Sequence, residues 1–279
     1  MHRISIIGYG VVGQSIHRLF GDEIVAVKDP KFKEGFAKDE AMGMTQSNLD
    51  NSDLIVICVP TNEKEDGSAD TSIVWESLQY IANNTKNFPV TLIKSTVPPS
   101  EIKKMFLAYP RLVFSPEFIE ESKYFTPPWK YPDPRNMESH TWQVFGGEKK
   151  DTSTCVDIFK RKMGVDTQFF QTDIITASLA KYMENSFFAL KVTFCNEWFD
   201  IAKTFGVDYN ELRELWLLDP RINRNHTLVF PKDRGYGGRC FPKDIKAIVT
   251  DSMKAGYTPG LMMTTSNINN NFRKENDKK

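Results

Sequence analysis

The stretch Ile4-Ser-Ile-Ile-Gly-Tyr-Gly-Val-Val-Gly13 decides the fold class of this chain. Its apolar start predicts a strand over residues 4–7, and residues 14–20 show the spacing of an amphipathic helix. Strand, glycine turn and helix in this order are the setting in which G-x-G-x-x-G indicates dinucleotide binding. The stretch therefore predicts the first βα unit of a Rossmann-type fold.

Three glycines and two valines of this turn are the expected contacts of the cofactor's phosphates. Gly8 allows the tight turn, Gly10 the close approach of a pyrophosphate, and Gly13 the packing of helix against strand. Val11 and Val12 stand at the start of the helix, where unpaired N–H groups and the helix dipole favour an anion. We expect these five residues to bind the cofactor.

A carboxylate in the expected place favours NAD as that cofactor. A second strand over residues 24–27 leads to Asp29, 21 residues after Gly8, where a carboxylate can accept hydrogen bonds from the ribose hydroxyls. The same charge repels the 2′-phosphate of NADP, so we expect NAD. Lys28 and Lys31 lie close by in sequence and leave the strictness of this preference open.

Composition argues against several kinds of partner. The 279 residues carry 36 Lys and Arg against 36 Asp and Glu, so no net charge favours nucleic acid or an anionic membrane. The longest apolar run, residues 54–59, is far shorter than the roughly 20 residues that span a bilayer, and no signal peptide is visible. The four cysteines lack C-x-x-C spacing, which argues against a metal site or disulfides and favours the cytoplasm.

Residues 1–172 alternate strand-like and helix-like segments, which predicts an α/β NAD-binding domain with a doubly wound, mostly parallel sheet. Short apolar runs rich in β-branched side chains predict further strands at residues 54–59, 90–93, 111–114 and 142–145. Ligands of such sheets bind beyond the carboxyl ends of the strands. Since Thr61, Thr96 and Glu117 each follow a strand, we expect them to converge on one crevice.

Residues 173–205 contain no glycine or proline and predict one long helix. Asp173 is the expected N-cap, and Gly206 is the expected residue after the last turn. At 1.5 Å per residue the helix reaches about 50 Å, which is more than one small domain covers. We therefore place a helical domain at residues 173–279 and expect the apolar face of the helix to pack on a second domain or on a second copy in a homodimer.

A second glycine-rich segment, Gly235-Tyr-Gly-Gly-Arg-Cys-Phe-Pro-Lys-Asp244, contains a lone cysteine. Glycines let a ligand approach the backbone, and the neighbouring Arg239 and Lys243 favour the thiolate form of Cys240, so this cysteine can act as a nucleophile. An irregular loop that holds a small apolar cysteine explains the same residues. From this segment alone, both interpretations stay open.

Seven motifs in a fixed order resemble the UDP-glucose/GDP-mannose dehydrogenase family. They are Gly8-x-Gly-x-x-Gly13, Val59-Pro-Thr61, Lys94-Ser-Thr-Val-Pro98, Ser115-Pro-Glu-Phe118 with Glu121-Ser122, Lys181-x-x-x-Asn185, Asp219-Pro-Arg-Ile222 and Gly235-Tyr-Gly-Gly-x-Cys-x-Pro-Lys-Asp244. The family oxidises the primary alcohol of a sugar nucleotide to a carboxylate with two NAD. The resemblance implies the same activity, a nucleotide-sugar substrate and NAD for this chain.

The resemblance also implies catalytic roles at the matching positions. Thr96 and Asp244 would hold the water that takes the hydroxyl proton during the first hydride transfer. Cys240 would attack the aldehyde, giving a thiohemiacetal and then a thioester. Lys181 and Asn185, four residues apart on one helix face, would stabilise the oxyanions.

Further positions would serve hydrolysis and binding. Glu117 would assist the water that hydrolyses the thioester, beside the substrate contacts Phe118 and Gly237. Arg221, from the same or a neighbouring subunit, would meet the C6 oxygens. The implied cofactor contacts after the glycine turn are Thr61, Thr96, Glu121 and Lys243. A solvated helix pair of Glu117 and Glu121, and a turn-forming role for Thr96, are the structural alternatives.

The chain departs from the family pattern near its end. The family's UDP-binding domain is expected to be missing or supplied by a separate chain, and residues 266–279 read as a frayed polar terminus. The segment 221–235 is longer than usual, and its cations Arg224, Lys232 and Arg234 are expected in a solvated loop, with contact to a phosphate as the alternative. Two other functions stay open: a two-electron NAD-dependent hydroxyacid or alcohol dehydrogenase, and a non-catalytic NAD-binding remnant or partner subunit.

Overall fold

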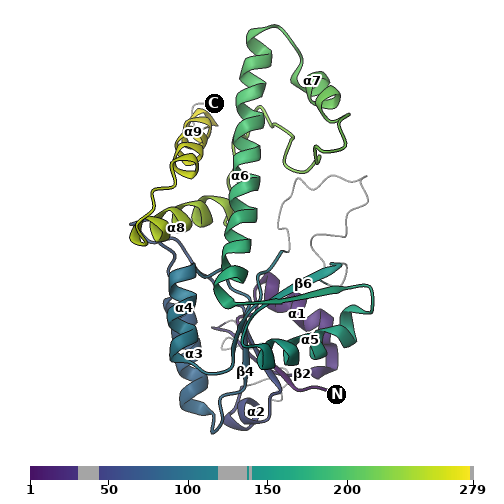
Figure 1. Ribbon diagram of the computed structural model, residues 1–279, viewed down its shortest axis with the longest axis vertical. Coiled ribbons are helices and arrows are strands. Elements are labelled where there is room, and N and C mark those ends of the chain that lie inside the picture. The colour runs from purple at the N-terminus through teal and green to yellow at the C-terminus, as the bar shows by residue number, and fades with distance from the viewer. Residues whose placement is uncertain (31–43, 119–136, 138–139, 277–279) are drawn as a thin grey trace. The chain divides into compact units, whose positions relative to one another are not determined.

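The computed structural model describes residues 1–30, 44–118, 137 and 140–276 (Figure 1). The chain divides into two compact units. The first consists of residues 1–62 and 70–181, and the second of residues 63–69 and 182–279. This division by contacts falls inside the longest helix, and the domain boundary expected at residues 172 and 173 stays a prediction.

The first unit is built on one sheet of seven strands among the described residues, in the order β2-β1-β3-β4-β5-β6-β7. Neighbouring strands pair in parallel except β5 and β6, which are antiparallel. The strands are β1 (Ile4–Ile7), β2 (Ile24–Lys28), β3 (Leu54–Ile57), β4 (Val90–Ile93), β5 (Leu112–Phe114), β6 (Trp142–Gly147) and β7 (Gln168–Thr172). The predicted Rossmann-type fold with a mostly parallel sheet is confirmed.

Helices cover both faces of this sheet, which explains why every residue of β1, β3 and β4 is buried. The helices of the first unit are α1 (Val11–Phe20), a 3₁₀ turn η1 (Gly21–Glu23), α2 (Gln46–Asp50), α3 (Ser72–Asn84), α4 (Pro99–Ala108) and α5 (Lys149–Met163). One hydrophobic cluster joins the sheet to α1 and α5, and a second joins it to α2, α3 and α4. Buried parallel sheets have this two-sided cover.

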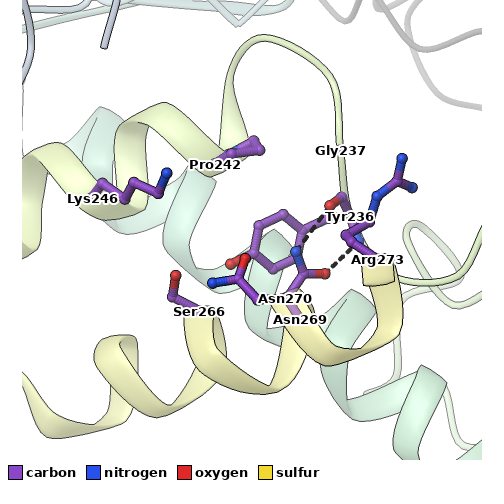
Figure 2. Close-up of a pocket in the computed structure, with 8 residues that line it drawn as sticks. All are labelled: Tyr236, Gly237, Pro242, Lys246, Ser266, Asn269, Asn270 and Arg273. Atoms are coloured by element: carbon purple, nitrogen blue, oxygen red, sulfur yellow. Dashed lines mark hydrogen bonds between the residues drawn. The ribbon is translucent and has the colours of Figure 1, made fainter. Parts of the chain in front are cut away.

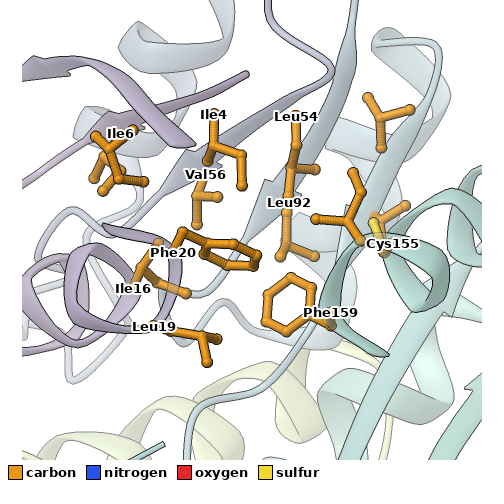
Figure 3. Packing of buried hydrophobic residues seen from close by; sticks show 14 of the residues in the cluster. Ile4, Ile6, Ile16, Leu19, Phe20, Leu54, Val56, Leu92, Cys155 and Phe159 are labelled. Atoms are coloured by element: carbon orange, nitrogen blue, oxygen red, sulfur yellow. The ribbon is translucent and has the colours of Figure 1, made fainter. Parts of the chain in front are cut away.

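The first cluster shows how alternation along the strands supplies its core (Figure 3). Ile4 and Val56 point to the α1 and α5 face, whereas their neighbours along each strand belong to the opposite cluster or to polar positions. Phe20 of α1 and Phe159 of α5 meet edge to face at 5.1 Å between ring centres. Burying a side chain of this size stabilises the fold by about 1.5–3 kcal/mol, so this cluster fixes α1 and its glycine turn to the sheet.

The longest helix, α6 (Ile174–Thr204), confirms the helix predicted over residues 173–205. Asp173 caps it, since Asp173 Oδ1 accepts the N–H groups of Ile175 (3.0 Å) and Thr176 (2.9 Å). Gly206 follows its end with a φ of +70°, in the left-handed region that closes many helices. None of the helices in the described residues is long and apolar enough to cross a membrane.

The second unit contains most of α6 and three shorter helices, α7 (Tyr209–Trp216), α8 (Phe241–Lys254) and α9 (Gly260–Asn276). The frayed terminus expected at residues 266–279 is wrong for the described part, because α9 continues to Asn276 and buries Asn269 and Phe272. Polar side chains of α9 find partners inside the fold, so a polar composition does not prevent order here.

Candidate active site

The glycine turn has the geometry that a bound dinucleotide needs. Gly8 has a φ of +91°, and a Cβ added there would lie 2.6 Å from the Cys58 carbonyl oxygen, while a Cβ on Gly13 would lie 2.2 Å from the Gly8 oxygen. By contrast, a Cβ on Gly10 would meet nothing within 4 Å. Two glycines are therefore required by the fold and the third faces open space, which fits close approach by a phosphate.

Helix α1 begins immediately after this turn, at Val11, with Gly10 as an N-cap that offers no side-chain oxygen to the helix N–H groups. Asp29, directly after β2, is fixed to the turn because its Oδ2 accepts the N–H of Tyr9 at 2.7 Å. The residues present fit a dinucleotide with its pyrophosphate at the start of α1. Tyr9 was not predicted as a site residue, since its contribution is a backbone group.

Side chains after β3 and β4 tie two loops of the first unit together. The Thr61 hydroxyl donates to the Thr96 carbonyl oxygen (2.9 Å), and the Ser95 hydroxyl donates to the Val59 carbonyl oxygen (2.6 Å). The Ser178 hydroxyl of α6 donates to the Val97 carbonyl oxygen (2.7 Å). The loop that carries Thr96 is thus held on both sides.

The loop after β5 contributes a buried ion pair. Glu117 Oε2 lies 3.1 Å from Nζ of Lys94, whose side chain is fully buried while that of Glu117 is 8% exposed. Lys94 also donates to the Ser115 hydroxyl (3.2 Å), and Glu117 Oε1 accepts the N–H of Phe118 (2.9 Å). The alternative of a solvated Glu117 is wrong, and its proposed helix partner Glu121 lies outside the described residues.

Lys94 was missed as a site residue, although it belongs to one of the motifs. A lysine directly after a buried strand was the available signal, because a buried ammonium requires a paired anion. In the same unit, Lys181 Nζ lies 4.8 Å from the centre of the Phe118 ring, within the range of a cation–π contact.

In the second unit, the cysteine segment leads into α8. Cys240 is the N-cap of α8 and its carbonyl oxygen accepts the N–H of Asp244 at 2.8 Å. Asp244 is buried and its Oδ2 accepts from Asn185 Nδ2 at 2.6 Å, while Lys243 forms an ion pair with Oδ1. Three predicted residues, Cys240, Asp244 and Asn185, are therefore brought together.

Exposure separates Cys240 from the other three cysteines. Cys240 is exposed, whereas Cys155 and Cys195 are buried and Cys58 is partly so. Burial raises the pKa of the thiols of Cys58, Cys155 and Cys195, which keeps them protonated and inert. The exposure of Cys240 argues against the alternative of an irregular loop that holds a small apolar cysteine, and its role as a nucleophile stays a prediction.

Two arginines that the sequence analysis singled out, Arg221 and Arg234, differ in their surroundings. Arg221 is exposed, and its guanidinium forms an ion pair with Asp219, with Nη2 2.6 Å from Oδ2. The first and third residues of the Asp-Pro-Arg motif therefore contact each other. Arg234 is neither solvated nor available to a phosphate. Its guanidinium is buried against Asn196 and Asp200, with contacts of 2.7–3.0 Å.

The predicted residues divide between the units. The first holds the glycine turn with Asp29, Thr61, Thr96, Glu117, Phe118 and Lys181, and the second holds Asn185, Arg221, Gly237, Cys240, Lys243 and Asp244. Gly237 lines a pocket of about 160 Å³ between α8 and α9, with Tyr236, Asn269 and Arg273 among its walls (Figure 2). No group of three His, Cys, Asp or Glu side chains within the described ranges is placed to hold a metal ion.

The described residues combine a Rossmann sheet that carries a dinucleotide turn with a helical unit that holds an exposed cysteine and a buried carboxylate, which places the chain among dinucleotide-binding proteins. Sequence comparison gives the family. Residues 29–127 match the NAD binding domain of the UDP-glucose/GDP-mannose dehydrogenase family, and residues 175–271 match its central domain. The chain belongs to this family and carries its NAD-binding domain.

Individual relatives agree with this assignment. A UDP-glucose 6-dehydrogenase of Rickettsia felis is 32% identical over 209 residues, which cover 72% of this chain and 44% of that protein. The structure of a UDP-glucose dehydrogenase from Pyrobaculum islandicum has a TM-score of 0.76 at 24% identity, over 97% of this chain and 68% of its own. The chain thus spans less than half the length of the Rickettsia protein.

A second kind of dehydrogenase shares the fold. The 3-hydroxyisobutyrate dehydrogenase of Mycobacterium tuberculosis has a TM-score of 0.70 at 15% identity, over 99% of this chain and 95% of its own. At this identity the likeness concerns the fold alone. The fold is therefore compatible with both reactions, and the residues at the site must distinguish them.

Proposed function

We propose that this chain carries the NAD-binding and catalytic parts of a nucleotide-sugar 6-dehydrogenase, which oxidises a C6 alcohol of the UDP-glucose type to the uronic acid. The observation that carries the proposal is the exposed Cys240 at the start of α8, one turn before the buried Asp244–Asn185 pair. Oxidation of an alcohol to an acid without release of aldehyde uses a covalent nucleophile, whereas transfer of a single hydride does not require one.

The first oxidation removes a proton and a hydride from the alcohol, and NAD, when bound at the glycine turn, accepts the hydride. We assign the proton to a water held by Asp244, with Thr96 as its second ligand. Asp244 suits this role because Asn185 and Lys243 fix both of its oxygens. A carboxylate oriented in this way can pass the proton on without losing its position.

The second oxidation proceeds through Cys240. Its thiolate attacks the aldehyde carbon, a C–S bond forms, and the carbonyl electron pair moves to oxygen. Lys181 and Asn185 are proposed to donate hydrogen bonds to that oxyanion, as fixed donors do in other acyl-transfer sites. Loss of the second hydride, which a second NAD molecule would accept, then leaves a thioester on the cysteine.

Hydrolysis releases the acid and restores the thiolate. Glu117 is proposed to take the proton of the attacking water, after which the C–S bond breaks. The ion pair with Lys94 keeps one carboxylate oxygen 3.1 Å from the ammonium, so the position of Glu117 is fixed by the fold. Phe118, Gly237 and Arg221 are proposed substrate contacts, and Thr61 and Lys243 are proposed cofactor contacts together with Glu121.

The test is the number of NADH molecules formed per sugar when the protein receives excess NAD and limiting UDP-glucose. We expect a ratio near two. Cys240→Ser is expected to fall to one or below, while Cys195→Ser, the same change at a buried cysteine of the second unit, keeps the ratio. A wild-type ratio of one would identify the two-electron alternative instead.

Protein that binds NAD but forms no NADH from UDP-glucose contradicts this proposal and supports a non-catalytic NAD-binding subunit. A separately produced UDP-binding domain of a relative is then added. NADH formation after this addition would indicate a missing partner chain, and its continued absence would indicate that the chain has lost catalytic activity. We further propose that the chain acts as a homodimer, on the basis of the apolar side chains that α6 leaves exposed.

A further inference from the structure

Three consecutive backbone N–H groups just before the cysteine loop each donate to an asparagine side chain. The N–H of Arg234 donates to Asn276 Oδ1 (2.9 Å), that of Tyr236 donates to Asn269 Oδ1 (2.7 Å), and that of the glycine between them donates to Asn196 Oδ1 (3.1 Å). The amides of Asn276 and Asn269 also donate back, at 3.0 Å, to the carbonyl oxygens of the same residues. The backbone N–H and C=O groups of this segment are thus hydrogen-bonded as they would be in a β-sheet, but their partners are asparagine side chains.

Asn269 is the most restrictive of these contacts. It is 3% exposed and both of its polar atoms are used by Tyr236, which is itself buried (Figure 2). Gly235 has a φ of +74°, and a Cβ there would lie 2.5 Å from Asn269 Oδ1, so the loop backbone lies directly against this amide. Removing the amide would leave a buried N–H and a buried C=O of Tyr236 without partners.

The residues after this contact are few and exposed. Residues 237–240 are all exposed, and Gly238 has a φ of +77°. At the far end, α8 begins at Phe241 and Asp244 is fixed by Asn185. Cys240 therefore lies at the end of a four-residue span between two buried asparagine contacts, and these two contacts limit where its backbone can lie.

We propose that Asn269 is a positioning residue for Cys240, so that α9 forms part of the catalytic machinery without touching substrate. The kinetic part of this proposal rests on the proposed function, because only a reaction through Cys240 is sensitive to where Sγ lies. The structural part stands on the contacts of the second unit alone.

The test compares Asn269→Leu with Asn270→Leu, the same change at the next position of α9, where the side chain is exposed. Hydrogen exchange of the Tyr236 amide is expected to be at least tenfold faster in Asn269→Leu and unchanged in Asn270→Leu. Should Asn269→Leu not fold, Asn269→Gln keeps both groups of the amide and displaces them by one methylene, so it is expected to show a smaller change in the same direction.

The reactivity of Cys240 provides a readout that loss of stability alone would not move. Alkylation of Cys240 by iodoacetamide, followed by mass spectrometry well below the unfolding temperature of each variant, is expected to slow at least threefold in Asn269→Leu. The reason is that Cys240, the N-cap residue of α8, then spends less time in its place at the helix N-terminus, a position that favours the reactive thiolate.

Turnover completes the test. With UDP-glucose, Asn269→Leu is expected to lower the NADH per sugar from two toward one and to release aldehyde that hydroxylamine traps, with NAD affinity unchanged. The proposal is overturned if Asn269→Leu and Asn270→Leu show the same hydrogen-exchange rate at the Tyr236 amide and the same alkylation rate at Cys240. If wild-type protein forms no NADH, the proposed function fails, and exchange and alkylation still decide the role of Asn269.

Discussion

At the scale of single residues, the buried side chains of Lys94 and Glu117 in the first unit must be explained together. Lys94 and Glu117 lie in neighbouring loops, after β4 and β5, and their contact is excluded from solvent. Burying one such charge alone costs several kcal/mol, and its partner offsets that cost. Each of the two charges therefore requires the other, whatever reaction Glu117 serves.

Lys94→Met tests this pairing. The change keeps most of the length of the side chain and removes its charge, so Glu117 is left buried without a cation. We expect the free energy of unfolding, measured by urea titration at pH 7, to fall by about 3–5 kcal/mol. Lys104→Met is the matched control, since Lys104 pairs with Glu101 at 2.6 Å but its side chain is 64% exposed, and it is expected to cost about 1 kcal/mol or less.

The double variant Lys94→Met with Glu117→Gln removes both charges and is expected to recover much of that loss. Should Lys94→Met destabilise no more than Lys104→Met, the buried pair is not the cause of stability at this position. The same variants separate stability from the proposed hydrolytic role, because Glu117→Gln would stall turnover at the thioester even where the protein is fully folded.

At the scale of elements, the residue pattern within a segment predicted the strands and helices that do not depend on contacts with distant parts of the chain. The β-branched runs of β1, β3 and β4 predicted strands, and the absence of glycine and proline predicted α6. Helix α9 was missed because its asparagines are stabilised by the backbone of residues 234–236, which no local pattern reveals. The Lys94–Glu117 contact was missed for the same reason, since it depends on β4 and β5 being neighbours.

The cap of α6 gives a prediction at this scale. The hydroxyl of Thr176 and the N–H groups of the first turn donate to Asp173 and hold the pKa of its carboxyl below the ordinary value of 3.8. We expect Asp173→Ala to lower the free energy of unfolding by about 1 kcal/mol at pH 7. Asp173→Asn retains an oxygen acceptor and is expected to cost less than Asp173→Ala.

The sign of the pH dependence follows from the direction of the shift. A carboxyl group whose pKa is lower in the folded state stabilises the fold above its unfolded value, and this contribution is lost as the pH falls through the folded value. The difference between wild type and Asp173→Ala should therefore be constant from pH 5 to pH 7 and shrink below pH 3.8. Urea titrations across that range measure it, and a difference that grows on acidification would contradict the cap.

At the scale of the whole molecule, α6 carries more exposed apolar surface than an isolated subunit explains. Separations of three, four or seven residues place these side chains on one stripe of the helix. Exposed fractions range from 36% to 78% for the members of this stripe, which are Met183, Phe187, Phe194, Trp198, Ile201 and, just after the helix, Phe205. A continuous stripe of this kind indicates a contact surface.

We expect this stripe to join two copies of the chain, so that sedimentation at micromolar concentration shows twice the chain mass of 32.0 kDa. Phe187→Glu combined with Trp198→Glu places two charges on the stripe, and burying them without partners is costly, so the variant should sediment as a monomer. Phe170→Glu, at an aromatic residue of β7 that is 53% exposed, should remain a dimer. A wild-type protein that sediments only as the 32.0 kDa species would show instead that the stripe is covered by another partner or by nothing, and the homodimer would have to be abandoned.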